Sequence, residues 1–280
     1  MILDHRKYNE IDYKKYKRVF IFGCSFTAYE MWPGWAEILC MEMPDAEKFN
    51  YAQQGGGNLF ISSMVAYADQ KHKFREDDLI LLMWTTHCRE DRYKETRWIT
   101  PGNIFTQGAI SADFVKEWAC VKGYLVRDLS LMSLTKNYLK NLSCDSVMLR
   151  AVDPDSDERM YMGRGNLDDV IDFYRDIVFD TADTLYSSAH NGLGGWTNGH
   201  HYYWTEVFKD KLFSDYHPNP KMYMEYLQKI GFELSPGTIS NVIEVNNQLL
   251  SLEHRETIQQ WRKELYKTML TKYNHNMSIF

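Results

Sequence analysis

The chain lacks the features that define several large classes of protein. It has no apolar run near the roughly twenty residues that a membrane-spanning helix needs, so we expect no membrane partner. Its formal net charge is −6 and its pI is about 5.9, whereas a nucleic-acid-binding surface needs clustered excess Lys and Arg. We therefore expect no nucleic-acid partner. Residues 1–7 lack the apolar core of a signal peptide, which predicts a cytoplasmic protein.

Cysteine is scarce and shows no pairing. The five cysteines are an odd number without the spacing of metal ligands: Cys24, Cys40, Cys88, Cys120 and Cys144. They are typical of reduced thiols made in a cytosol, and a phage protein later assembled into a virion would show the same pattern. His190, His200 and His201 have no carboxylate or thiol at ligand spacing, so we interpret them as loop histidines. We expect neither a metal nor an organic cofactor.

Apolar and aromatic residues, in contrast, are plentiful. Hydrophobic residues make up 44% and aromatic residues 15% of the 280 residues, enough for the core of one large domain. The pair Trp32 and Trp35 and the run Tyr202-Tyr203-Trp204 can stack on sugar rings or simply fill the core.

The most informative stretch is a short apolar run that ends in a turn of small residues. Val19–Phe22 is typical of a buried strand, and Gly23-Cys24-Ser25 follows it directly. Open α/β sheets bind their ligands at the carboxyl ends of strands. Ser25 is therefore either a nucleophile at that edge or a residue that caps the next helix.

Strand and helix signals alternate along the rest of the chain. We predict further strands at 49–52, 79–84 and 146–152, and helices at 35–40, from 58, at 166–178 and at 218–230. Helical spacing from Phe114 through Trp118 to Met132 predicts a stripe that faces the core. Residues 239–270 are predicted to form an amphipathic helix that docks on the domain or on a partner.

Three short motifs occur in the order found in one enzyme superfamily. Gly23-Cys24-Ser25 stands where that superfamily has Gly-Asp-Ser, and Asn50–Gly55 stands where it has a short strand that leads to a glycine. Asp215-Tyr216-His217-Pro218 stands where it has a C-terminal Asp and a His followed by proline. Through residues 18–231 the chain resembles the SGNH (GDSL-type) hydrolases, in particular their divergent bacteriophage and bacterial members.

The resemblance implies a fold and a domain organisation. The expected fold is α/β, a three-layer α/β/α sandwich with a mainly parallel, flavodoxin-like sheet. An SGNH hydrolase-like domain would span residues 1–235, with an irregular insertion around 153–210. A C-terminal helical extension would span residues 236–280.

The resemblance also implies a Ser-His-Asp triad of Ser25, His217 and Asp215. Ser25 would attack an ester carbonyl, His217 would act as its base, and Asp215 would orient the imidazole. Most members place the Asp three residues before the His, whereas Asp215 lies two before His217. Alternating, strand-like backbone would still put both side chains on one side.

The oxyanion hole departs further from the family pattern. The implied donors are the backbone N–H groups of Ser25 and Gly55 and an Asn from a Gly-x-Asn-Asp motif. The corresponding segment, Trp84 to Arg89, contains no Asn. Candidates to replace this third donor are Thr86, Asn58 and Arg89.

The expected function is that of a serine esterase or acyl-hydrolase acting on a small or carbohydrate-linked O-acyl ester. Two alternatives stay open. One is a catalytically weakened binding or structural protein, such as a phage assembly component, which meets an oligomeric or assembly partner through its C-terminal helix. The other is an acyltransferase, which would share the triad.

Overall fold

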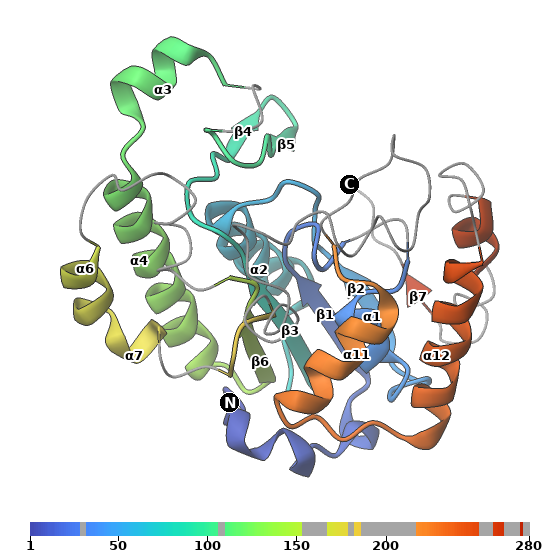
Figure 1. Cartoon of the computed structure of the whole chain (residues 1–280). Coiled ribbons are helices and arrows are strands. Elements are labelled where there is room, and N and C mark those ends of the chain that lie inside the picture. Colours follow the sequence, from blue (N-terminus) through green and yellow to red (C-terminus); the bar gives the residue numbers. More distant parts are fainter. Residues whose placement is uncertain are drawn as a thin grey trace.

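The computed structural model of the chain describes residues 1–28, 32–105, 110–152, 167–178, 182–185, 217–251, 260–265 and 275–276. Its centre is a parallel sheet in the order β6-β3-β1-β2, to which the two-residue strand β7 adds at the β2 edge (Figure 1). The bounds are β1 Arg18–Phe22, β2 Glu47–Asn50, β3 Asp78–Trp84, β6 Asp145–Arg150 and β7 His275–Asn276. This is the strand order of a doubly wound sheet: the chain adds β2 on one side of β1, and then β3 and β6 on the other side.

The central strands are buried on both faces. In β1, Val19 and Ile21 belong to one hydrophobic core, and Phe20 and Phe22 belong to the other. All seven residues of β3 are buried as well. Parallel strands covered on both faces have continuous rather than alternating apolar sequences, which explains why these runs could be recognised from the sequence.

Helices cover both faces of the sheet (Figure 1). One layer holds α1 (Trp35–Cys40), α11 (Pro220–Lys229) and α12 (Pro236–Leu250). The other holds α2 (Asn58–His72), α4 (Val121–Lys140), α6 (Asp168–Phe173) and α7 (Arg175–Val178). The expected α/β class with a parallel sheet is confirmed. Among the described residues, no helix has the length and apolar character needed to cross a membrane.

The polar segment after β3 contains more structure than a loop. Strands β4 (Arg92–Lys94) and β5 (Arg97–Ile99) form an antiparallel hairpin, and α3 (Ala112–Trp118) follows. Figure 1 shows both beyond the carboxyl ends of the central strands, near α4. Two short 3-10 helices, His5–Glu10 and Tyr13–Lys15, precede β1.

The predicted apolar stripe is wrong at Trp118. The helix is interrupted at Ala119, whose backbone is extended (φ −77°, ψ 119°), and a new helix begins after Cys120. Trp118 is 68% exposed, whereas Leu125, Leu129 and Met132 are buried. Phe114 of α3 is half-buried against the same core, whereas Trp118, at the end of α3 just before the break, lies outside it.

The segment after residue 235 packs on the rest of the domain. Val242 and Leu249 of α12 lie in the same core as α1 and α11. Arg262 forms a buried ion pair with Glu37 of α1, with Nη2 and Oε1 3.4 Å apart. The helix ends at Leu250, earlier than predicted, because Ser251 ends the α-helical hydrogen bonding. Most of the expected insertion (153–166, 179–181 and 186–210) lies outside the described residues.

Candidate functional site

The turn that carries Ser25 is tightly fixed at the end of β1. The Cys24 carbonyl accepts hydrogen bonds from the N–H groups of Thr27 (2.9 Å) and Ala28 (2.8 Å). A Cβ on Gly23 would lie 2.1 Å from Thr27 Oγ1, so the packing of the turn requires glycine there. Cys24 is fully buried, whereas Ser25 is partly exposed. Of the two side chains, only that of Ser25 is exposed to solvent.

The turn that carries Gly55 lies against the turn of Ser25. The N–H of Gln53 donates to the carbonyl of Gly23 over 3.1 Å, so the two turns share a backbone hydrogen bond. Gly55 has φ +72°, and a Cβ there would lie 2.3 Å from the Thr100 carbonyl oxygen. Both the backbone conformation and the close approach of the hairpin segment require glycine.

His217 reaches the same edge from the far end of the chain. Its ring lies against the ring of Phe26, the residue after Ser25, with centroids 4.9 Å apart. The indole of Trp32 donates to the Pro218 carbonyl over 2.7 Å, which ties this segment to the β1–α1 connection. The structure thus brings the segments of Ser25, Gly55 and His217 together. Asp215 lies outside the described residues.

Several polar groups of this site have no partner within the described part of the chain. Neither Ser25 Oγ nor the backbone N–H groups of Ser25 and Gly55 form a hydrogen bond there. Ser25 therefore forms no direct hydrogen bond with His217, whose ring contacts the next residue, Phe26. Trp32 and Trp35 are fully buried and fill the core, so they present no face to a sugar; Tyr202–Trp204 lie outside the described residues.

The three candidates for the third oxyanion donor are engaged to different degrees. The Asn58 amide donates to the Thr85 carbonyl (3.2 Å) and to Asp128 Oδ2 (2.9 Å), which uses both of its hydrogens. It would have to break one of these bonds to act on a substrate. Arg89 donates from Nε to Thr86 Oγ1 and from Nη1 to the Gly56 carbonyl, each over 3.0 Å. Arg89 thus ties the β3 turn to the glycine-rich turn.

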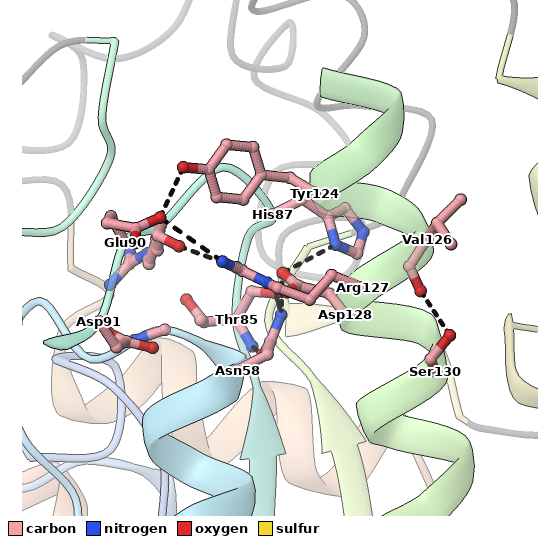
Figure 2. Close-up of polar contacts among 12 residues, drawn as sticks. Asn58, Thr85, His87, Glu90, Asp91, Tyr124, Val126, Arg127, Asp128 and Ser130 are labelled. Atoms are coloured by element: carbon pink, nitrogen blue, oxygen red, sulfur yellow. Dashed lines mark hydrogen bonds and ion pairs between the residues drawn. The ribbon is translucent and has the colours of Figure 1, made fainter. Parts of the chain in front are cut away.

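A buried charged cluster that sequence reasoning missed lies beside these residues, between the β3 turn and α4 (Figure 2). His87 Nδ1 and Asp128 Oδ2 are 3.3 Å apart, and both side chains are at most 5% exposed. Arg127 Nε donates to Asp128 Oδ1 over 2.7 Å, and Arg127 Nη2 forms an ion pair with the same oxygen at 2.7 Å. Burial acts to raise the pKa of Asp128, but the hydrogen bonds and charges of His87 and Arg127 outweigh it and lower the pKa.

The cluster continues through two more carboxylates. Glu90 accepts a hydrogen bond from Tyr124 (2.6 Å) and pairs with Arg92 (2.7 Å). Asp91 accepts from the N–H groups of Gly57 (2.8 Å) and Phe60 (2.9 Å), which caps the start of α2. Burial raises the pKa of Asp91 in spite of these bonds. The only sequence signal for the cluster is the density of charged residues directly after a buried strand.

Metal binding finds no support within the described ranges, where no three His, Cys, Asp or Glu side chains are grouped to hold an ion. His190, His200 and His201 lie outside those ranges. Comparison with known proteins found no match for this chain among family models, curated proteins or solved structures.

Proposed function

We propose that this chain is a serine hydrolase of the SGNH type, an esterase or acyl-hydrolase that acts on a small or carbohydrate-linked O-acyl ester. The observation that carries the proposal is the contact between His217 and Phe26. It brings a histidine to the residue next to Ser25 across 191 positions of the chain, at the sheet edge where α/β proteins bind ligands. The fixed turns of Ser25 and Gly55 support the same interpretation.

The proposed reaction follows from these groups. Ser25 Oγ attacks the ester carbonyl carbon while His217 takes its proton. The carbonyl oxygen gains negative charge, which the N–H groups of Ser25 and Gly55 stabilise. The tetrahedral intermediate collapses, the bond to the alcohol oxygen breaks, and His217 returns the proton to that oxygen. Water then attacks the acyl-serine with His217 again as base, and Asp215 orients the imidazole throughout.

Substrate binding has to shorten the distance between the His217 imidazole and Ser25 Oγ, because no hydrogen bond joins the two residues among the described contacts. Catalytic hydrogen bonds are often long without substrate and tighten when the complex forms. The acyltransferase alternative uses the same residues and replaces water by an acceptor alcohol. Product analysis with and without added alcohols separates the two reactions.

Labelling with a fluorophosphonate probe, followed by mass-spectrometric mapping of the modified residue, tests the proposal. The probe reacts only with an activated serine, and we expect modification at Ser25, lost in His217→Ala. Ser63→Ala is the matched control, because Ser63 donates to the Leu59 carbonyl of its own helix and has no place in the site. An unlabelled wild-type protein, or labelling that stays unchanged in Ser25→Ala, contradicts the proposal.

A further inference from the structure

One buried hydroxyl at the end of β3 has no hydrogen-bond partner among the described residues. Thr85 is 3% exposed, and within the described part of the chain nothing forms a hydrogen bond with its Oγ1. Its backbone is fully engaged: the N–H donates to Asn58 Oδ1 over 2.9 Å, and the carbonyl accepts from Nδ2. A buried hydroxyl without a partner destabilises a protein, and valine has nearly the same shape without that penalty. The hydroxyl therefore needs an explanation outside stability.

The strand register places Thr85 beside the turn of Ser25. Strands β1 and β3 are parallel neighbours, and Phe22 and Leu82 are the last paired residues of their ladder. Ser25 and Thr85 each lie three residues beyond that pair. Asn58, which holds the Thr85 backbone, lies three residues after Gly55. Thr85 thus lies beside the turn that carries Ser25, and Asn58 ties its backbone to the start of the helix that follows Gly55.

The alternation of β3 gives the direction of the side chain. Leu81 and Met83 lie in the core that contains α1 and α11, and Leu82 and Trp84 lie in the opposite core. Successive side chains of a strand point to opposite faces, and Thr85 is the residue directly after β3. Continued by one residue, the alternation puts Thr85 on the face of Leu81 and Met83. The core on that face also contains Phe26, on which His217 packs.

We infer that the Thr85 hydroxyl is the third oxyanion donor of this site, in place of an asparagine side chain. The inference rests on the proposed hydrolase function. The Thr85 hydroxyl and the N–H groups of Ser25 and Gly55 form a set of three donors that have no partner among the described contacts. Asn58 and Asp128 are then positioning residues, because the Asn58 amide holds the Thr85 backbone and Asp128 holds that amide.

The test compares Thr85→Val with Thr86→Val, both measured by steady-state ester hydrolysis. Thr86 is the matched control, a buried threonine one position on whose hydroxyl already accepts from Arg89. Loss of one oxyanion donor lowers kcat roughly 100- to 1000-fold in related chemistry, with KM little changed because the bond forms in the transition state. We expect this loss for Thr85→Val, a smaller effect for Thr86→Val, and recovery of most activity in Thr85→Ser.

Folding is monitored in the same variants by thermal denaturation. Thr85→Val removes no hydrogen bond, so its midpoint should equal or exceed that of the wild type. Should it fail to fold, Thr85→Cys replaces the hydroxyl by a weak donor of similar size and serves instead. A folded variant of either kind with wild-type kcat, or a larger loss of kcat in Thr86→Val, overturns the inference.

Fluorophosphonate labelling separates failure of this inference from failure of the proposed function. Wild-type protein labelled at Ser25, with a fully active Thr85→Val, leaves the hydrolase proposal standing and removes Thr85 from it. Wild-type protein that is neither labelled nor active overturns both.

Discussion

Two histidine-containing clusters lie at the carboxyl ends of the central strands, and they differ in how their polar groups are satisfied. In the cluster of His87, Asp128 and Arg127, charged groups face one another at short distances within the protein. In the cluster of Ser25, Gly55 and His217, the hydroxyl and two backbone N–H groups have no described partner. Polar groups that already bind one another stabilise the fold, and groups without partners can bind a substrate.

The difference also shows why a buried His–Asp pair is not by itself evidence of catalysis. Asp128 binds Asn58 and Arg127 as well as His87, so its hydrogen-bonding capacity is largely used in holding α4 against α2 and β3 (Figure 2). His217, just before α11, instead packs on Phe26, the residue that follows the partly exposed Ser25. We therefore expect the cluster of His87, Asp128 and Arg127 to act in stability, as a structural cluster. We expect the cluster of Ser25, Gly55 and His217 to act in catalysis, as a functional cluster.

The largest expected effect is on catalysis, from Ser25→Ala. Loss of the nucleophile or its base in a serine hydrolase lowers kcat on the order of 10⁵- to 10⁶-fold. Single-turnover and steady-state assays with short-chain esters measure the loss, and the thermal midpoint should not change. His87→Gln, in the structural cluster, is the comparison and should lower stability more than kcat per folded molecule. Wild-type turnover in Ser25→Ala would remove the functional cluster from the mechanism.

The next effect is on stability, from Asp128→Asn. Removing one partner of a buried ion pair typically lowers the free energy of unfolding by about 3–5 kcal/mol. We expect the lower end of this range, because the Arg127 side chain is 28% exposed and also pairs with Glu90. The control is Asp172→Asn: its pair with Arg175 is 63–64% exposed and is expected to contribute at most about 1 kcal/mol. Urea denaturation measures both. Equal, small losses would mean that the cluster does not stabilise the fold.

A smaller effect is the pH dependence of that loss. The pKa of Asp128 is lowered in the folded protein, so its ionised form stabilises the fold above the unfolded pKa of about 3.9. That contribution disappears as pH falls through the lower, folded pKa. The difference in unfolding free energy between wild type and Asp128→Asn should therefore shrink below about pH 4. Comparison of the two proteins cancels the opposite contribution of Asp91, whose pKa is raised. A difference that grows with acid contradicts the assignment.

The smallest effect compares two buried threonine hydroxyls. Thr135 Oγ1 and Ser62 Oγ share a hydrogen bond of 2.8 Å, so Thr135→Val should lower the free energy of unfolding by about 1 kcal/mol. Thr85→Val should leave it unchanged or raise it by up to about 1 kcal/mol, because the Thr85 hydroxyl has no described partner. Urea titrations of the two variants give the comparison. A clear loss of unfolding free energy in Thr85→Val would mean that the Thr85 hydroxyl forms a stabilising hydrogen bond, which contradicts this prediction.

Much of the fold could be predicted because its signals are local. The strand at 79–84 was recognisable from its continuous apolar run, and the structure has β3 at Asp78–Trp84. The helix predicted at 35–40 agrees with α1, which begins after Gly34. Gly231, with φ +101°, follows α11 as a C-terminal glycine does.

The candidate site was predictable only in part. Ser25 and Gly55 follow strands, so the rule for parallel sheets brings them to one edge, and His217 precedes a helix that packs there. The charged cluster was not predictable, because Asn58 and Asp128 are 70 positions apart and His87 and Asp128 are 41 apart. Residue type and local spacing contain no information about which distant acidic residue Asn58 or His87 will contact.

The amino-acid sequence by itself determined which segments became strands and helices and which small residues stand at their turns, because these depend on apolar periodicity and backbone conformation. Only the tertiary structure decided which polar groups were satisfied. The hydroxyls of Thr85 and Thr86 are one position apart, yet one has no described partner and the other binds Arg89. Strand alternation turns adjacent side chains to opposite faces, and what each meets there depends on helices far away in the chain.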